Sequence, residues 1–279
     1  MCSSDLEPFT RLFNQGQILG ADGERMSKSR GNVQDPDELV ARHGADAVRL
    51  FLMFMGPWDQ GGAWSSSGIS GMVRFLGRVW TLALDPHGRE PGNPNAGALP
   101  DGEDVAAAEA TIRQAAHRAV HGIGVDIEAF RFNTAVAKLM ELANALFPYR
   151  GSVVAGGAAW NQAIRYLLAG MAPLAPHLAD EIHCRLQREA GIDERDPRWR
   201  SIHAEPWPEV DPAALVERRR EVPIQVNGRL RDRLEVSAEA TESEIEALAL
   251  ASPKVRAALE GRTPKRVIHA GGRLVNIVG

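Results

Sequence analysis

Residues 134–147 read Thr-Ala-Val-Ala-Lys-Leu-Met-Glu-Leu-Ala-Asn-Ala-Leu-Phe, and this stretch indicates the fold class. Its apolar side chains recur at the three- and four-residue spacing of one helix face. They are Val136, Leu139, Met140, Ala143 and Phe147. A helix of this kind exposes an apolar stripe that only another helix can cover. The stretch therefore predicts a helix, capped by Asn133, that belongs to a bundle.

Similar patterns lie downstream and just upstream of this helix. Further helices are predicted over residues 104–122, 125–129, 158–171 and 176–190. Because helices of this length must cover one another's apolar stripes, the pattern predicts an antiparallel helical bundle.

The first hundred residues mix short helices with loops. Asp35 followed by Pro36 predicts a capped helix that ends at Gly44. Residues 45–55 and 68–84 predict two more helices, and residues 85–102, rich in Pro, Gly and Asn, predict a surface loop.

The apolar period changes to two near the end of the chain. Every second residue from Val222 to Val226 is apolar, and Asn227-Gly228 predicts a turn into a second strand. A two-residue turn would send the apolar side chains of the two strands to opposite faces. We therefore expect a three-residue loop with a left-handed Gly228, which places Ile224 opposite Leu230.

Two helices and a second hairpin follow. Thr241 and Glu244 have the spacing of a capping box, and Ser252-Pro253 opens another helix that ends at Gly261. Residues 266–269 and 274–278 predict two further strands. The expected fold is mainly α, with a small α+β module at the C-terminal end.

Composition excludes several classes of protein. The 279 residues are 44% hydrophobic and 24% charged, which is typical of globular proteins and not of disordered ones. No apolar run approaches the roughly 20 residues that span a bilayer, and no secretory signal pattern begins the sequence. Two cysteines provide neither a C-x-x-C zinc motif nor a disulfide framework. We therefore expect a cytoplasmic protein without a membrane partner.

The charge is distributed unevenly. From Arg218 to the end there are twelve Lys or Arg against eight Asp or Glu, a net charge of +4, whereas the whole chain carries −4. A basic terminal module on an acidic body suits a protein that binds a polyanion with one part only. A chance fluctuation of composition is the alternative.

Residues 25–32 read Arg-Met-Ser-Lys-Ser-Arg-Gly-Asn and contain three cations and no acid. The string is not a Walker loop, because Ser27 stands where that motif requires Gly before Lys-Ser. Small hydroxyl side chains beside the Lys28 ammonium are suited to phosphate oxygens, as nucleotidyl transfer requires. A solvated basic loop without a ligand is the alternative.

This string resembles the KMSKS signature of class I aminoacyl-tRNA synthetases. The resemblance implies that Lys28 is catalytic and contacts the phosphates of ATP, which acts with Mg²⁺. It also implies that the nucleotide lies against the stretch Arg25, Met26, Ser27, Lys28 and Ser29. Arg25 departs from the family, which usually has Lys at this position. The planar guanidinium of Arg25 therefore replaces a compact ammonium group.

Other strings narrow the resemblance to bacterial-type leucyl-tRNA synthetases. They are residues 29–32, 43–47, 53–60, 74–80, 132–135, 139–142, 172–178 and 226–228. The resemblance implies three domains: a tail of the catalytic domain (1–66), a helical anticodon-binding-type bundle (67–216, with the loop 85–102), and a C-terminal tRNA-binding module (217–279). It also implies that leucine and tRNA(Leu) are the partners of the intact enzyme.

The sequence contains no H-x-G-H string, which such an enzyme needs for its nucleotide-binding half. We therefore interpret the chain as a C-terminal portion that does not charge tRNA by itself. The intact enzyme is expected to be a monomer, or this chain pairs with the missing N-terminal half. A non-catalytic tRNA-binding module, or the smaller subunit of a split synthetase, is the alternative function.

Arginines alternate along the strand after Gly228. Arg229, Arg231 and Arg233 are expected on one face of their hairpin, near Lys265, Arg266 and Arg273 of the opposing hairpin. They form a candidate phosphate-contacting surface, and the family resemblance favours tRNA as its ligand. A solvated strand face is the alternative. Without an aromatic residue between the arginines, we expect contacts to the RNA backbone and little base stacking.

Histidines and cysteines suggest no metal centre. His117 and His121 lie four residues apart on a predicted helix, but no third ligand is evident, so solvent-facing imidazoles are favoured over a metal site. His177 and Glu181 are interpreted as a local hydrogen bond. Cys184 is interpreted as a small buried side chain.

Overall fold

The computed structural model describes residues 11–65, 67–88, 97–100, 103–216, 219–237, 240–259, 262–270 and 274–279. The chain divides into two compact units, Met1–Ala214 and Leu215–Gly279. The further division of the first unit near residue 66 stays a prediction. Within the described residues, none of the helices combines the length and the apolar character that crossing a membrane requires.

The first unit opens with short elements. Strands β1 (Ile18–Leu19) and β2 (Gly62–Ala63) pair in parallel, and helices α1 (Pro36–His43) and α2 (Ala45–Phe54) lie between them in the chain. Asp35 caps α1 as predicted, because its side chain accepts a hydrogen bond from the backbone N–H of Asp37.

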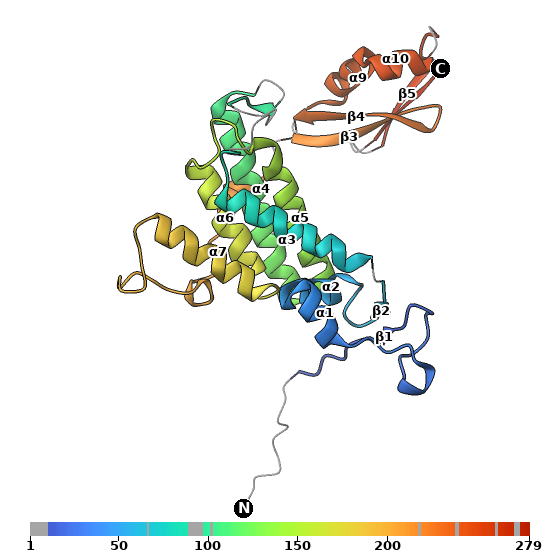
Figure 1. The fold of residues 1–279 in the computed structure, drawn as a ribbon. Helices are drawn as coiled ribbons and strands as arrows, with labels where there is room; N and C mark the ends of the chain where they lie inside the picture. The colour runs from blue at the N-terminus through green and yellow to red at the C-terminus, as the bar shows by residue number, and fades with distance from the viewer. Residues whose placement is uncertain are drawn as a thin grey trace, which may run out of the picture. The chain divides into compact units, whose positions relative to one another are not determined.

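The rest of the first unit is a helical bundle (Figure 1). Its long helices are α3 (Gly68–Leu84), α4 (Val105–Glu128), α5 (Phe132–Leu146), α6 (Ala158–Met171) and α7 (Pro176–Glu189). Short helical turns follow at Phe147–Tyr149, Ile202–Ala204 and α8 (Pro212–Leu215). The mainly α fold and the helical bundle expected from the sequence are confirmed.

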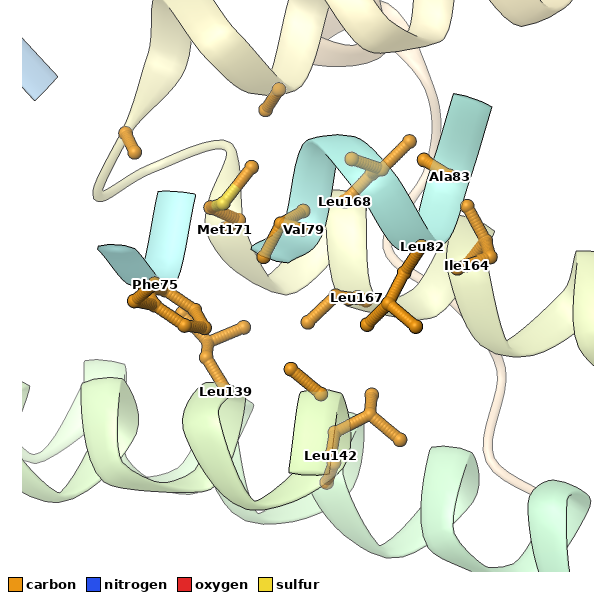
Figure 2. Close-up of a cluster of buried hydrophobic side chains, with 14 of the residues drawn as sticks. Phe75, Val79, Leu82, Ala83, Leu139, Leu142, Ile164, Leu167, Leu168 and Met171 are labelled. Atoms are coloured by element: carbon orange, nitrogen blue, oxygen red, sulfur yellow. The ribbon is translucent and has the colours of Figure 1, made fainter. Parts of the chain in front are cut away.

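Apolar side chains from three helices meet in the centre of the bundle (Figure 2). Val79 and Leu82 come from α3, Leu139 from α5, and Leu167 and Met171 from α6, and each is fully buried. Burying one such side chain contributes about 1.5–3 kcal/mol relative to leaving it exposed. Val136, Leu139 and Ala143 of the predicted stripe are buried in this core. Met140 is only partly buried, and Phe147 lies beyond the end of α5 and is 45% exposed, so the prediction is wrong for Phe147.

Two details of the bundle differ from the sequence prediction. Helix α4 runs without a break through Gly122 and Gly124, where two separate helices were expected. Both glycines make room for neighbouring side chains, since a methyl group on Gly122 would lie 2.6 Å from Cε of Lys138. Helix α5 begins at Phe132, so Asn133 is in its first turn and is not its cap.

The second unit is a four-stranded sheet covered on one side by two helices (Figure 1). The strands β3 (Arg219–Val226), β4 (Arg229–Ser237), β5 (Arg266–His269) and β6 (Val275–Val278) lie in the order β4-β3-β6-β5. Helices α9 (Glu242–Ala251) and α10 (Pro253–Leu259) connect the two hairpins. The predicted capping box forms between Thr241 and Glu244.

The turn of the first hairpin differs from the prediction. Val226 pairs with Arg229, so the loop contains only Asn227 and Gly228. Both residues have positive φ, 51° and 78°. This is the type I′ backbone that Asn-Gly favours, because its twist matches the twist of the flanking strands. The expected three-residue loop is wrong.

A bulge in β4 reconciles the two-residue turn with a common apolar face. Gln225 pairs with Leu230, the next pair is Ile224 with Asp232, and Arg231 between them has no partner in β3. The extra residue shifts the alternation of β4 by one position. The prediction that Ile224 lies opposite Leu230 is therefore wrong, and Leu230 lies on the other face of the sheet.

Candidate functional site

The Lys28 loop, residues 20–32, contains one turn of 3₁₀ helix at Lys28–Arg30. Ser27 enters the turn in an extended conformation, and Gly31 ends it with a φ of 67°. The backbone N–H of Gly31 donates to the carbonyl oxygen of Lys28 at 3.2 Å. A side chain would strain the backbone at that φ, which explains why Gly follows the third cation.

The side chain of Asn32 holds the two ends of the loop together. Its Oδ1 accepts from the backbone N–H of Ser27 at 2.9 Å, and its Nδ2 donates to Asp22 at 3.1 Å and to the carbonyl oxygen of Arg25 at 3.4 Å. A hydrogen bond from the Glu24 backbone lowers the pKa of Asp22, and the bond from Asn32 acts in the same direction. Asn32 thus fixes the backbone on both sides of Lys28.

Upstream acids neutralise one of the three cations. Arg30 Nη1 lies 3.0 Å from Glu24 Oε2, an exposed ion pair. Arg25 and Lys28 form no ion pair within the described part of the chain. The loop therefore presents two exposed cations that are available to an anion, and Lys28 is not held in an internal ion pair.

A cavity of about 550 Å³ lies beside the loop. Arg25 and Met26 line it together with Gln15, Gln17 and Trp58. Ser27, Lys28 and Ser29 do not line it, so the five predicted contact residues fall into two groups. The first two line the cavity, whereas the ammonium of Lys28 is exposed outside it.

Helix α2 joins this region to the bundle through a buried acid. The carboxylate of Asp46 accepts from the backbone N–H of Leu178 at 2.7 Å and lies 2.8 Å from Nδ1 of His177. Ala175, at the N-cap of α7, has no side-chain acceptor, so Asp46 supplies the cap from another helix.

Arg49, one turn further along α2, contacts the segment that precedes α7. Its guanidinium donates to the carbonyl oxygens of Pro173 at 3.0 Å and of Leu174 at 3.2 Å. A cation at free carbonyls and an acid at free N–H groups both complement the local backbone charge. The two contacts fix α2, and with it the chain leading from the Lys28 loop, against the connection between α6 and α7.

Sequence reasoning assigned no role to Asn32, Asp46 or Arg49. Asp46 carried a signal, because an acid within the apolar run 45–55 requires partners when that helix is buried. Arg49 interrupts the same run. Asn32 carried no signal of its own, since its partners lie up to ten residues away in the chain.

The basic residues of the second unit do not share one face. Arg229 pairs with Val226, whose side chain is buried under the helices, whereas Arg233 pairs with Pro223 on the open face. Cross-strand partners point to the same side of a sheet. The bulge at Arg231 separates the two, so the expectation that all three arginines project from one face is wrong.

The basic residues also differ in their partners. Arg233 Nη1 lies 2.6 Å from Glu221 Oε1. Among the residues that the structure describes, Arg229, Arg231, Lys265 and Arg266 form no ion pair and are exposed. Arg273 lies outside the described residues. Four of the five candidate phosphate contacts are therefore uncompensated cations.

The histidines take part in structural contacts. His117 is buried, its Nδ1 accepts from the backbone N–H of Asp211 at 3.1 Å, and its ring meets Tyr166 edge-on. Burial lowers the pKa of His117. The expectation of a solvent-facing imidazole is wrong for His117, because the segment around Asp211 covers it, while His121 is exposed.

Two smaller expectations also need correction. His177 contacts Asp46, and Glu181 pairs with Arg185, so the expected bond between His177 and Glu181 is not the one formed. Cys184 is half-buried, and burial raises the pKa of its thiol. In the described ranges, no three His, Cys, Asp or Glu side chains form a cluster that could hold a metal ion.

Comparisons with known families define the class of the protein. Residues 1–63 match the family of class I tRNA synthetases (I, L, M and V), and residues 109–246 match the anticodon-binding domain of tRNA ligase. With the helical bundle and the KMSKS-type loop, these matches show that the chain belongs to the class I aminoacyl-tRNA synthetases.

The most similar relatives that were compared are all of one kind within this class. Leucine–tRNA ligases of Herpetosiphon aurantiacus and Dehalococcoides mccartyi are both 42% identical to the chain over 272 residues, which is 98% of the chain and 31% of each relative. A crystal structure of a ternary LeuRS–tRNA–LeuAMS complex from Agrobacterium radiobacter K84 matches with 30% identity and a TM-score of 0.65, over 98% of this chain and 34% of that one. The resemblance to leucyl-tRNA synthetase is confirmed, and the chain spans about a third of the length of these relatives.

Proposed function

We propose that this chain is part of a leucine–tRNA ligase and that its Lys28 loop acts in the formation of leucyl-adenylate from leucine and ATP. The observation that carries the proposal is the exposed ammonium of Lys28, which pairs with none of the residues that the structure describes and stands on a preformed turn beside a cavity. Negative charge grows on the β- and γ-phosphates as pyrophosphate leaves, and a cation already in place stabilises it.

Arg25 and Met26 take a different part from Lys28 in this proposal. Both line the cavity beside the loop, where they contact the nucleotide, while Lys28 reaches the phosphate end. Ser27 and Ser29 hydroxyls, 3.2 Å apart, supply further donors to phosphate oxygens.

Magnesium finds no ligand set of its own in this region. Asp22 accepts from Asn32 and from the Glu24 backbone, and Glu24 is paired with Arg30. The described residues therefore do not fit a protein-held Mg²⁺ ion, and no step of the proposal uses one.

The bundle and the second unit bind tRNA(Leu) in this proposal, while leucine passes to the terminal ribose of that tRNA in the cytoplasm. The exposed cations Arg229, Arg231, Lys265 and Arg266, which form no ion pair in the described part of the chain, support an RNA-binding role for the second unit.

The isolated chain provides the test. It should bind a tRNA(Leu) transcript with an affinity that falls as salt rises, and it should show no leucine-dependent exchange of pyrophosphate into ATP. Exchange activity of the chain alone would overturn the proposal that it needs the rest of a ligase. Absence of tRNA binding at low salt would overturn the proposed RNA-binding role.

The alternative is a non-catalytic tRNA-binding module or the smaller subunit of a split synthetase. The observation that favours it is the set of exposed cations at Arg229, Arg231, Lys265 and Arg266, which lie in a compact unit separate from the Lys28 loop. An upstream reading frame that encodes the other two thirds supports a ligase, whole or split, whereas its absence supports the binding module.

A further inference from the structure

One face of the C-terminal sheet is covered and the other is open. Val222, Ile224 and Val226 of β3 and Val275 and Ile277 of β6 are buried in a cluster with α9 and α10. Residues between them in each strand point to the opposite side, because side chains alternate along a strand. Figure 1 shows both helices on one side of the sheet.

The open face has a row of four side chains across all four strands. Leu230 of β4 pairs with Gln225 of β3, Gln225 pairs with Asn276 of β6, and Asn276 pairs with Ile268 of β5. With strands roughly 4.8 Å apart, the row is about 14 Å long. Two amides in the middle are therefore flanked by two aliphatic side chains.

The two aliphatic residues of this row are exposed to solvent although burial would be favourable for both. Leu230 is 48% exposed and Ile268 is 38% exposed. Leu230 faces outward because the two-residue turn pairs it with Gln225, and the bulge at Arg231 then returns the later residues of β4 to the core side. A regular three-residue loop would have placed this leucine over the core, so the observed register costs buried apolar area.

The amides of the row have free hydrogen-bonding capacity. Oδ1 of Asn276 accepts from the backbone N–H of Gly228 at 3.0 Å, and its Nδ2 donates to no residue that the structure describes. The amide of Gln225 makes no hydrogen bond to any residue that the structure describes. Donors and acceptors are therefore available between the two apolar flanks.

Cations border the open face, which also carries Glu221 of β3, and further acids lie on α9. Arg266 and Arg233 flank the row on β5 and β4, next to Lys265, although Arg233 is paired with Glu221. Glu242, Glu244 and Glu246 lie on α9, which covers the other face. The open face therefore favours an anionic partner that also presents flat apolar surfaces with hydrogen-bonding edges.

We propose that the row Leu230, Gln225, Asn276 and Ile268 contacts an unpaired or exposed nucleobase of the RNA, while the bordering cations hold its phosphates. This inference rests on the proposed tRNA-binding function. Leu230 and Ile268 pack against base planes, and the amides bind a base edge. The second unit contains no Phe, Trp or Tyr, so aliphatic side chains do what aromatic residues do in other RNA-binding sheets.

The test compares two RNAs that carry the same number of phosphates. The full chain is titrated with a tRNA(Leu) transcript and with a fully paired RNA hairpin, over salt concentrations from roughly 50 to 200 mM. A surface that reads bases prefers the tRNA, because a paired stem buries its bases. We expect the double variant Leu230→Ser, Ile268→Ser to weaken tRNA binding about tenfold, with the salt slope and the hairpin affinity unchanged.

Control variants separate the two kinds of contact. Leu248→Ser changes a leucine of α9 that is 50% exposed, and it should alter neither affinity. Arg266→Ala should reduce the salt slope for both RNAs by about one. If circular dichroism shows that the double variant is misfolded, Gln225→Ala replaces it, since that amide bonds to none of the described residues. Gln225→Ala should weaken tRNA binding several-fold.

Four results would overturn the inference. One such result is that the wild-type chain binds tRNA no better than the hairpin. Another is that a sheet variant weakens the binding of both RNAs equally. Either result would exclude base contacts by this face but would not contradict the proposed tRNA-binding function. A third result would be a wild-type dimer in sedimentation experiments that Leu230→Ser abolishes without changing the affinity for RNA. In that case the open face would serve self-association. A chain that binds neither RNA would overturn the proposed tRNA binding and this inference together.

Discussion

The Lys28 loop and the open sheet both present cations, but they hold them by different means. In the loop, the amide side chain of Asn32, which follows Lys28, bonds to Asp22, Arg25 and Ser27, which precede it. In the sheet, the positions of the arginines follow from the backbone register, which the turn and the bulge determine.

This difference decides which changes each region tolerates. A loop fixed by one side chain is sensitive to a single substitution, whereas a sheet fixed by backbone pairing tolerates side-chain changes until the register itself shifts. The charge on the ATP phosphates changes during the proposed reaction, and a loop can adjust to that change. The surface of a folded RNA does not change in this way, so a rigid sheet can bind it.

The largest effect is expected at the ammonium of the loop. In a ligase reconstituted with this chain, Lys28→Ala should lower leucine-dependent pyrophosphate exchange by about 10²–10³-fold, the typical loss when one preorganised charge-stabilising group is removed. Binding of tRNA, measured by filter retention, should be unchanged. If Lys28→Ala lost tRNA binding and kept normal pyrophosphate exchange, Lys28 would be an RNA-binding residue and not a catalytic one.

The next effect tests whether Asn32 determines the shape of the loop. Asn32→Ala removes its hydrogen bonds to Ser27, Asp22 and Arg25, and bonds of this kind contribute about 0.5–1.5 kcal/mol each. We expect roughly a tenfold loss of exchange activity and faster hydrogen exchange at the Ser27 amide. Val33→Ala, a neighbouring exposed position, is the control. Unchanged exchange at Ser27 would contradict this role of Asn32.

A smaller effect is expected where α2 meets α7. Asp46→Ala leaves backbone N–H groups of α7 without their acceptor, and loss of a cap costs about 0.5–2 kcal/mol. Thermal unfolding followed by circular dichroism should show a lower Tm for the helical unit. Asp59→Ala, an exposed acid, is the matched control. Equal Tm values for the two variants would mean that the cap adds nothing.

The arginines of the sheet should differ among themselves. Arg229→Ala should weaken tRNA binding several-fold and reduce the salt slope by about one, because no described acid pairs with this guanidinium. Arg233→Ala should have a smaller effect, because Glu221 already compensates its charge. The triple change of Arg229, Arg231 and Arg233 to Ala should give the sum. Equal slopes for both single variants would contradict this ranking.

The smallest effect concerns pH. Hydrogen bonds from Ser252 and then Lys254 lower the pKa of Asp232 from 3.8 to about 2. Because the folded pKa lies below the unfolded one, the stabilisation is complete above about pH 4 and is lost as the pH falls toward about 2. Methyl NMR of the full chain in urea should show the sheet weakening over this range. Asp232→Asn should flatten that dependence, and an unchanged pH dependence would exclude Asp232 as its source.

Much of the fold was predictable because it follows local patterns. Helix α6 matches its predicted span, and the capping box at Thr241 forms as expected. The errors arise where a distant residue decides. Gly122 and Gly124 suggested a break in α4, but the helix is continuous there, and Lys138 and Trp207 occupy the space beside the two glycines.

The candidate site was predictable in part. The string around Lys28 identified the loop and the class of protein, because its residue types and their spacing are specific. The role of Asn32 depends on its hydrogen bond to Asp22, ten residues upstream, and the charge of Arg30 depends on its ion pair with Glu24. The faces of the arginines depend on a bulge that no local pattern indicated.

The sequence by itself determined the helical stripes, the caps, the cationic string and the basic C-terminal end, since each depends on neighbours within a few residues. Only the tertiary structure decided which cations remain unpaired, which helix caps α7, and which face of the sheet Leu230 occupies. The physical reason is that ion pairing, capping between helices and strand register join residues far apart in the chain, and their energies depend on distances that folding alone sets.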